Sequence, residues 1–459
     1  MRRFRVAAVV LLAAPPSLPA QTIPPRTRAA ADQLITAALA DTMGYARLAK
    51  LTDTFGHRLS GSASLERAID WILATMQGDG FSAVRGEPVM VPKWVRGAES
   101  ATLLTPRRAP MNILGLGGSV ATPRDGITAE VLVVSSFDEL TARAGEAKGK
   151  IVLFDAPFDT TKAPLEAYRA VQVYRSTGAI AAAKVGAVAA LVRSLTPQSI
   201  ASPHTGGTRY DDAVTKIPFA AVTVEDAEML HRMQRRGEPI RLTLRMEAHT
   251  EADAPSRNVV AEIRGSERPD EVVVLGGHID SWDVGQGAMD DGGGSVAAWE
   301  AVRLMKELGL TPRRTIRVVL WTNEENGTRG GLAYRDAHKS ELANHVAAIE
   351  SDNGVFRPLG FRFQGSAAGL RLAQQLGALL QRTGSTRVEF GDGEADVGPI
   401  LREGVPGFAL DVDASKYFWY HHTEGDRMTV IDPVEFRKCI ATMAAMAYLL
   451  ADVPDVLPR

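Results

Sequence analysis

Five segments in the second half of the chain carry residue types that bind metal ions. They are His278, Asp290 with Asp291, Glu324 with Glu325, Asp352, and His421 with His422. Neutral imidazole and carboxylate oxygen both coordinate Zn²⁺ well. Two zinc ions about 3.5–4 Å apart need a bridging group, and a carboxylate with two oxygens supplies one. Two histidines and three carboxylates, one of them shared, would give each ion three protein ligands.

Two further carboxylates could serve such a centre without binding the metal. Glu324 stands beside Glu325, so one neighbour could be a ligand and the other a general base. Asp280 follows His278 by two residues, and on an extended backbone both side chains point the same way. Asp280 could therefore orient the His278 imidazole.

Each segment alone also has an ordinary structural interpretation. Asp290-Asp291 stands before glycines, a pattern typical of a turn or a helix N-cap, and Glu324-Glu325 could be a solvated pair. His421-His422 could belong to an interface. Their occurrence together in one domain favours a metal site. The remaining histidines that we considered are predicted to be structural or surface residues, namely His57, His204, His231 and His249.

The elements around these residues alternate between strands and helices. Apolar runs predict strands at Val272–Leu275, Ile316–Trp321 and Val346–Ile349, and helices over about 293–308 and 332–338. This alternation predicts an α/β fold with a mixed, mostly parallel sheet flanked by helices on both faces. Sites in such folds form beyond the carboxyl ends of the strands. His278, Glu324 with Glu325, and Asp352 all stand just beyond a predicted strand, and Asp290 ends the loop after the first strand.

The middle of the chain is predicted to form a separate domain. Residues 112–245 contain several short β-rich runs and no histidine–carboxylate cluster with ligand spacing. We predict an inserted β-rich domain at 112–245, with 21–111 and 246–459 forming the domain that carries the site. Helical spacing predicts a helix from 29 to about 51 and another from 65 to about 76.

The N-terminus indicates export. Three arginines precede an apolar run and a small-residue end, so residues 1–20 are predicted to be a signal peptide and the protein to be secreted or periplasmic, without a membrane anchor. The 52 Lys and Arg against 54 Asp and Glu give a net charge of −2; without the three arginines of the leader it is 49 − 54, or −5. That balance argues against nucleic-acid binding. A single cysteine excludes internal disulfides and cysteine-rich metal sites.

The motif block resembles a known enzyme family. Gly277-His278, Asp290-Asp291-Gly292, Asn323-Glu324-Glu325, Ser351-Asp352 and the late His422 are similar to the co-catalytic di-zinc exopeptidases, which include leucyl aminopeptidases and glutamate carboxypeptidases. The resemblance runs from about residue 29 to the C-terminus. It implies the zinc-exopeptidase fold, a protease-associated domain as the insertion, and a homodimer.

The resemblance also assigns roles. His278 and Asp352 would bind one zinc, Glu325 and His422 the other, and Asp290 would bridge them, with Glu324 as general base and Asp280 as the orienting aspartate. His422 is preferred over His421 because Asp426, four residues later, matches the family's spacing. A cis peptide is expected after Asp290. The family's tyrosine is replaced by His421, so His421 or Tyr420 would have to take over any oxyanion contact.

These observations predict a secreted di-zinc metallo-exopeptidase that hydrolyses dipeptides or short peptides through a zinc-activated water. The alternatives are an aminopeptidase of the same fold acting on longer peptides, and a non-catalytic binding homologue. The sequence leaves open the substrate side chain, the native metal, since manganese or cobalt accept similar ligands, and the role of Asp396, which is either a helix cap or a substrate contact.

Overall fold

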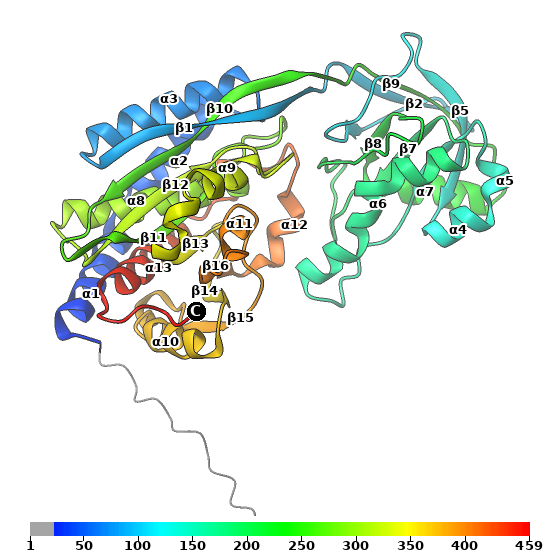
Figure 1. The fold of residues 1–459 in the computed structure, drawn as a ribbon. Helices are drawn as coiled ribbons and strands as arrows, with labels where there is room; N and C mark the ends of the chain where they lie inside the picture. The colour runs from blue at the N-terminus through cyan, green and yellow to red at the C-terminus, as the bar shows by residue number, and fades with distance from the viewer. Residues whose placement is uncertain (1–22) are drawn as a thin grey trace, which may run out of the picture.

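The chain folds into two lobes joined by a long β-ribbon (Figure 1). The computed structural model describes residues 23–459. The predicted leader at 1–20 therefore lies outside the described residues. One lobe holds both chain segments that flank the insertion, and the other holds the insertion itself.

The larger sheet has eight strands in the order β1-β10-β12-β11-β13-β16-β14-β15. The strands are β1 (Ser82–Val95), β10 (His249–Ile263), β12 (Arg314–Trp321), β11 (Arg268–His278), β13 (His345–Glu350), β16 (Gly407–Val412), β14 (Pro358–Gln364) and β15 (Arg387–Phe390). The central strands β12, β11, β13 and β16 run parallel, as do β14 and β15, while the remaining pairs are antiparallel. The prediction of an α/β fold with a mixed, mostly parallel sheet is confirmed.

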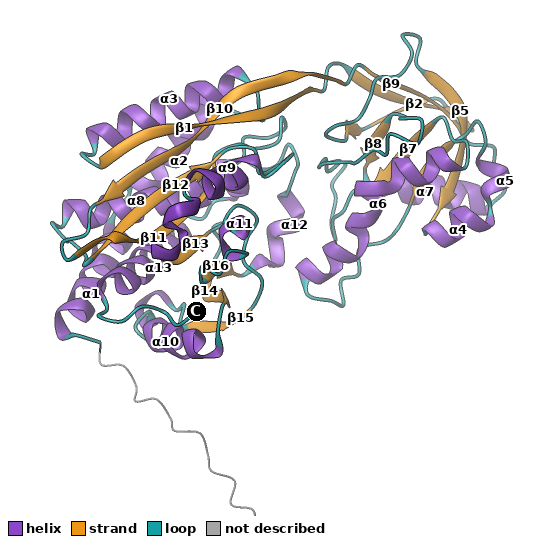
Figure 2. Cartoon of the chain, in the orientation of Figure 1, coloured by secondary structure: helices purple, strands orange, loops and turns teal. Residues whose placement is uncertain are grey.

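Helices cover both faces of this sheet (Figure 2). Alternate residues of one strand enter different cores, because successive side chains point to opposite faces. Val273 and Leu275 of β11 pack into the core formed with α8 (Gly293–Glu307) and α13 (Pro433–Asp452). Val272 and Val274 pack with residues of α9 (Arg329–Ala337) and α11 (Gly398–Leu401). The strand is buried on both faces, which explains its unbroken apolar run.

The helices of this lobe come from all parts of its sequence. They are α1 (Pro25–Ala40), α2 (Met43–Phe55), α3 (Ala63–Gly78), α8 (Gly293–Glu307), α9 (Arg329–Ala337), α10 (Ala367–Gly377), α11 (Gly398–Leu401), α12 (Tyr417–Tyr420) and α13 (Pro433–Asp452). The single helix predicted over 29–51 is wrong, because the chain forms α1 and α2 with a break at Asp41-Thr42. The Asp41 carboxylate accepts a hydrogen bond from the amide of Met43 there, which favours a turn.

The second sheet also has eight strands, in the order β3-β2-β9-β5-β6-β7-β8-β4. Its strands are β2 (Glu99–Thr105), β3 (Ala109–Met111), β4 (Ile113–Gly115), β5 (Ile127–Val134), β6 (Ile151–Phe154), β7 (Ala189–Arg193), β8 (Phe219–Val222) and β9 (Arg241–Met246), with helices α4 (Phe137–Ala142), α5 (Ala144–Ala147), α6 (Pro164–Lys184) and α7 (Val224–Arg235). Strands β2 and β3 precede the predicted boundary at 112. The second sheet therefore begins earlier in the chain than the composition indicated.

Two kinds of contact join the lobes. The antiparallel pair β1 and β10 runs out of the larger sheet toward the second one (Figure 1). Across the gap, Tyr168 of α6 stacks on Phe418 of α12 with ring centroids 4.5 Å apart. Arg96 pairs with Asp283, the guanidinium Nε lying 2.8 Å from a carboxylate oxygen. The site residues near α12 are therefore covered by the inserted lobe.

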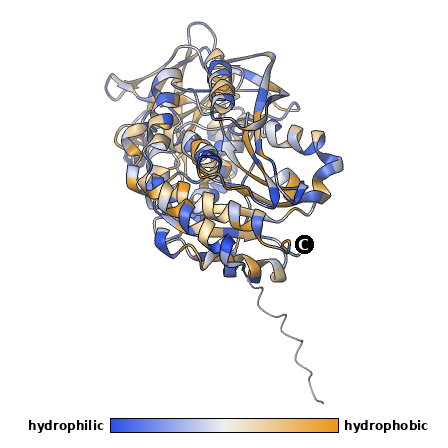
Figure 3. Cartoon of the chain, turned by 90° about the vertical axis from the view of Figure 1, so that its left-hand side faces the viewer, coloured by the Kyte–Doolittle hydropathy of each residue, from blue (hydrophilic) through white to orange (hydrophobic). Residues whose placement is uncertain are grey.

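Helix α13 is buried without interruption from Cys439 to Asp452. Its Cys439 is fully buried, and the thiol lies 3.0 Å from the carbonyl oxygen of Phe356. Figure 3 shows the outer helices with hydrophilic and hydrophobic residues interleaved, as expected for helices with one packed face. Among residues 23–459, no helix has the length and apolar character needed to cross a membrane.

Candidate metal centre

The parallel strands deliver their final residues to one edge of the larger sheet. His278 ends β11 and pairs in register with Trp321, the last residue of β12, so Glu324 and Glu325 follow beside it. Strand β13 pairs with the other side of β11 and ends at Glu350, two residues before Asp352. Residues separated by up to 74 positions thus meet in space.

The first group of candidate ligands surrounds the His278 imidazole. Its Nε2 lies 3.2 Å from Oδ1 of Asp352 and 3.3 Å from Oδ1 of Asp290. These atoms are close enough together for one cation to contact all three. His278 is fully buried, whereas 15% of the Asp352 side chain is exposed.

The second group surrounds the His422 imidazole. Its Nε2 lies 3.0 Å from Oε2 of Glu325 and 3.4 Å from Oδ2 of Asp290. His421 also reaches this group, with its Nε2 3.6 Å from the same Asp290 oxygen and its ring stacked on His422 at 3.5 Å. Asp290 therefore turns one oxygen toward each group, which is the arrangement a bridging ligand needs.

The donor set fits divalent zinc. Oδ2 of Asp290 and Oε1 of Glu325 are buried without a hydrogen-bond partner among the described residues. Burial, and then the charge of Asp290, raise the pKa of Glu325 to about 7. Crowded carboxylates with unpaired oxygens are costly in a protein interior. Two cations would supply the compensating charge, and imidazole with carboxylate is a set that zinc accepts.

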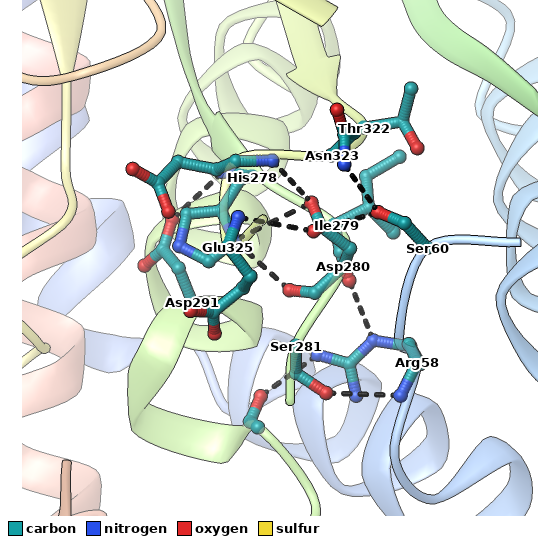
Figure 4. A network of polar contacts seen from close by, with 12 residues as sticks. Arg58, Ser60, His278, Ile279, Asp280, Ser281, Asp291, Thr322, Asn323 and Glu325 are labelled. Atoms are coloured by element: carbon teal, nitrogen blue, oxygen red, sulfur yellow. Dashed lines mark hydrogen bonds and ion pairs between the residues drawn. The ribbon is translucent and has the colours of Figure 1, made fainter. Parts of the chain in front are cut away.

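The His278 ring is oriented by a main-chain group. Its Nδ1 donates to the carbonyl oxygen of Asp280 at 2.9 Å, which leaves the lone pair of Nε2 free to coordinate a metal ion. The Asp280 carboxylate lies farther away, with Oδ1 3.7 Å from Nδ1. That carboxylate instead accepts the amides of Glu324 at 3.1 Å and Glu325 at 3.3 Å (Figure 4). Asp280 thus positions the turn that carries both glutamates.

His422 is held in a strained backbone conformation. Its φ of 61° is uncommon for a residue with a side chain. Two hydrogen bonds to Thr205 of the inserted lobe fix it, because the Thr205 amide donates to the His422 carbonyl at 3.0 Å and His422 Nδ1 donates to the Thr205 carbonyl at 3.3 Å. The orientation of this histidine depends on the insertion.

Asp426 holds the loop that carries Asp290. One of its oxygens accepts the amides of Ala288 at 3.1 Å and Met289 at 2.7 Å, and the other accepts the amide of Asp290 at 3.1 Å. In the sequence, the spacing to Asp426 served only to prefer His422 over His421 as the candidate ligand. Its contacts show that it fixes the backbone of the central carboxylate.

Arg58 also holds this loop, a role that was not predicted from the sequence. Its fully buried guanidinium donates to the carbonyls of Gly56, Ile279, Gln286 and Gly287 at 2.7–3.0 Å. Figure 4 shows it beside Ser281, whose hydroxyl accepts the Arg58 amide at 3.0 Å. A lone arginine in a loop gives no sequence signal of this role.

Asp291 links the loop to the helix that follows. Its carboxylate accepts the amides of His278 and Gly294, each at 3.0 Å. The peptide bond between Asp290 and Asp291 is cis, as the sequence resemblance led us to expect.

Glu324 faces a cavity of about 190 Å³ rather than an imidazole. Burial, and then the charge of Asp352, raise its pKa well above the ordinary glutamate value. The cavity is lined by Tyr168, Gln172, Arg175, Gly207, Asp290, Glu324, Glu325, Asp352, Tyr417, His421 and His422. The first four belong to the inserted lobe, which therefore forms one wall.

Two expectations about individual residues change. The tyrosines on the cavity wall are Tyr168 and Tyr417, not Tyr420. Asp396 is buried at 1% exposure and is not among the residues that line the cavity; its amide donates to Glu350 at 3.3 Å, and its carboxylate oxygens have no hydrogen-bond partner among the described residues, so the carboxylate caps no helix.

Comparison with known proteins gives consistent matches. The model of "Peptidase family M28" matches residues 258–447. Carboxypeptidase Q of Xenopus laevis and that of Homo sapiens are each 50% identical over 421 residues, covering 92% of this chain and 88% of theirs.

Solved structures agree. A peptidase M28 precursor from Shewanella amazonensis SB2B is 35% identical with a TM-score of 0.91, covering 95% of this chain and 98% of its own. An aminopeptidase from Aneurinibacillus sp. strain AM-1 shares the fold, with a TM-score of 0.65 at 20% identity over 93% of this chain and 97% of its own.

Proposed function

Because the chain belongs to peptidase family M28 and is half identical to the carboxypeptidase Q proteins, we propose that it hydrolyses dipeptides or short peptides at a centre of two zinc ions. It is a metallopeptidase of the exopeptidase type. The observation that carries the two-ion proposal is the position of Asp290, with one carboxylate oxygen toward His278 and the other toward His422. His278 and Asp352 would hold one ion, Glu325 and His422 the other, and Asp290 both.

Zinc ions bound there would supply Lewis acidity toward the scissile carbonyl and toward a water nucleophile. Glu324 lies on the cavity wall and is not drawn into either imidazole group, so it is available as general base. Its raised pKa suits a group that must take a proton from water and return it to the leaving amine near neutral pH. Asp280 holds the Glu324 amide and so keeps that carboxylate beside the centre.

The role of Glu324 is tested by Glu324→Gln. We expect this variant to retain its zinc by elemental analysis and to lose turnover by a factor on the order of 10²–10⁴. Glu403→Gln is the matched control, because Glu403 is exposed on a turn and does not line the cavity. Full activity in Glu324→Gln would refute the assignment.

A second candidate is an aminopeptidase of the same fold, which uses the same ligands. A panel containing a free dipeptide, an aminoacyl amide and an N-blocked dipeptide separates the two, because an aminopeptidase requires only the free amine. A non-catalytic binding homologue is disfavoured because every ligand position carries a ligand-type residue. Absence of both bound zinc and turnover in the purified protein would support the non-catalytic homologue instead.

We further propose that residues 1–20 direct export, that the inserted lobe is a protease-associated domain, and that the enzyme is a homodimer. N-terminal sequencing of the mature protein tests the first. The solution mass tests the third. The second is supported by the way the insertion covers the site, through Tyr168 on Phe418 and Thr205 on His422.

A further inference from the structure

The first group of candidate ligands is oriented from within its own lobe. Nδ1 of His278 donates to the Asp280 carbonyl at 2.9 Å. The His278 amide donates to the Asp291 carboxylate at 3.0 Å, and its carbonyl oxygen accepts the Ser295 hydroxyl at 2.8 Å. These four residues all lie between the end of β11 and the start of α8. The position of the His278 imidazole is therefore set without the inserted lobe.

The second group depends on the other lobe. Thr205 accepts from Nδ1 of His422 at 3.3 Å and donates its amide to the His422 carbonyl at 3.0 Å. Apart from the contacts with Asp290 and Glu325, His422 has no further hydrogen bond within residues 23–459. Its φ of 61° is costly for a residue with a side chain and persists only where neighbouring groups hold it. Thr205 is thus the residue that orients this imidazole.

Arg96 connects Thr205 to the first lobe. Its side chain lies at the junction of the lobes and is 11% exposed. Nε donates to the Asp283 carboxylate at 2.8 Å, Nη1 donates to the Gly115 carbonyl, and Nη2 donates to the Thr205 hydroxyl at 3.4 Å. The Thr205 hydroxyl in turn donates to the same Gly115 carbonyl at 2.8 Å. One guanidinium thus holds a carboxylate of the first lobe and the loop that carries Thr205.

Trp282, the neighbour of Asp283 in the chain, packs into the inserted lobe. It comes from the first lobe, yet its side chain, 2% exposed, belongs to the core cluster formed by β5, β7 and β8. A Cβ atom at Gly117 would fall 2.0 Å from Cη2 of the indole, so a side chain there would displace it. The centroid of the indole is 5.6 Å from that of the His422 ring. The interface between the lobes therefore runs beside His422.

These contacts link docking of the inserted lobe to zinc binding at one half of the centre. We call His278 with Asp352 the first half-site and Glu325 with His422 the second, Asp290 being shared. The His422 ring is held in place only when the lobes are docked, so docking raises the affinity of the second half-site. By reciprocity, an ion there stabilises docking by the same factor. The first half-site has no such dependence.

We infer that the inserted lobe forms part of only one of the two zinc half-sites, and that Arg96 is the residue that positions it. The inference rests on the two-ion centre proposed above and adds an order of events. The first half-site fills whether or not the lobes are docked, whereas the second fills together with docking. The supply of zinc therefore sets the fraction of molecules in which the cavity is closed by the inserted lobe.

The test measures zinc binding to each half-site by itself. Asp352→Ala leaves only the second half-site, Glu325→Ala leaves only the first, and Arg96→Met is added to each. Titration against a fluorescent zinc indicator gives the four affinities. We expect Arg96→Met to lower the affinity about 10- to 100-fold in Asp352→Ala, the range for losing an outer residue that orients a ligand. In Glu325→Ala the affinity should stay within about twofold, because nothing in the first half-site depends on Arg96.

Arg193→Met is the matched control. The Arg193 side chain is also 11% exposed and also pairs with two carboxylates, but these belong to Asp155 and Glu228, both within the inserted lobe. It should leave the affinity of both half-sites unchanged. Asp283→Asn removes the partner of Arg96 on the first lobe and should likewise weaken only the second half-site. This variant decides the question if Arg96→Met fails to fold.

A second readout follows docking rather than zinc. Hydrogen exchange is measured on peptides covering 203–209, where the Thr205 amide donates to the His422 carbonyl. At free zinc ten times the dissociation constant of the second half-site, exchange in the wild type should slow about five- to tenfold. In Glu325→Ala, which keeps only the first half-site, zinc should leave this exchange unchanged.

Equal weakening of both half-sites by Arg96→Met would overturn the inference, because it indicates a general structural role. No weakening of either, or zinc-independent exchange over 203–209 in the wild type, would also overturn it. Should an isolated half-site bind zinc too weakly to measure, the exchange comparison decides. Failure of the proposed function looks different: the expected binding and exchange without cleavage of any peptide would refute the peptidase reaction and leave the role of the inserted lobe standing.

Discussion

Replacing Asp426 by Asn should loosen the central carboxylate without touching a candidate ligand. Three backbone amides, those of Ala288, Met289 and Asp290, donate to the two Asp426 oxygens. The asparagine carbonyl can take over the two that share one oxygen, but its NH₂ group then faces the Asp290 amide. One charge-assisted hydrogen bond is lost and one buried N–H is left facing another donor.

The expected magnitude follows from that geometry. A hydrogen bond to a charged group contributes about 1.5–3 kcal/mol, and the neutral asparagine avoids burying a charge, which offsets part of the loss. We therefore expect the native conformation of the loop that carries Asp290 to be destabilised by about 1–3 kcal/mol. Because Asp290 lies between both ligand groups, this should appear as a loss of zinc affinity of roughly 10- to 100-fold.

Two measurements check the prediction. Competition with a chromophoric chelator gives the zinc affinity, and hydrogen exchange resolved on peptides covering 286–292 reports the opening of the loop. Asp432→Asn is the control. The Asp432 carboxylate also accepts backbone amides, those of Val434 and Glu435, but it does so at the start of α13. Zinc affinity within twofold of wild type, with unchanged exchange over the loop, would refute the argument.

Three further outcomes are expected. First, Arg58→Met removes the donor to four carbonyls, two of them fully buried, so the free energy of unfolding in urea should fall by about 3–5 kcal/mol; a fall below about 1 kcal/mol would contradict this. Second, removing zinc with a chelator should lower the melting temperature by roughly 5–10 °C, reversibly on adding zinc back, and Asp290→Ala should show neither bound zinc nor this shift. Third, burial lowers the pKa of His345 to about 4; the Tyr334 hydroxyl bonds to Nε2 of the neutral ring, while the hydrogen bond from Nδ1 to the Glu341 carbonyl offsets part of the lowering. Because the unfolded chain binds the proton near 6.5, stability is lost as the pH falls from about 6.5 to 4, by up to about 3 kcal/mol. Urea unfolding at pH 7 and pH 4.5 should show a smaller pH effect in His345→Gln than in wild type.

The strand ends that carry the site could be predicted from local pattern. The apolar run before His278 and the mostly apolar run before Glu324, which Arg317 interrupts, predicted strands of the sheet, and parallel neighbours bring their carboxyl ends to one edge. Only the family resemblance separated the roles of Glu324 and Glu325. In the structure the Asp280 carboxylate accepts the amides of both glutamates, and from this turn Glu325 reaches His422 while Glu324 lines the cavity.

Residues that act through tertiary contacts left no such pattern. Arg175 and Tyr168 come from a helix of the inserted lobe, and their place on the cavity wall depends on how two lobes pack. Tyr417 rather than Tyr420 faces the cavity because α12 is a single turn, and its direction is set by contacts such as that of Phe418 with Tyr168. The early start of the second sheet was not predicted because β2 and β3 form a short hairpin with each other, and this hairpin joins the sheet only through β9, far along the chain.

The buried thiol of Cys439 makes this enzyme convenient for spectroscopy. It is the only cysteine in the sequence, it is fully buried, and burial raises the pKa of its thiol far above the usual value. Maleimide dyes react with accessible thiolate and should leave the folded protein unlabelled. A pair of cysteines introduced on the two lobes would then carry fluorophores at known places without any prior removal of native thiols. Energy transfer between them would report, in single molecules, whether the lobes separate during turnover.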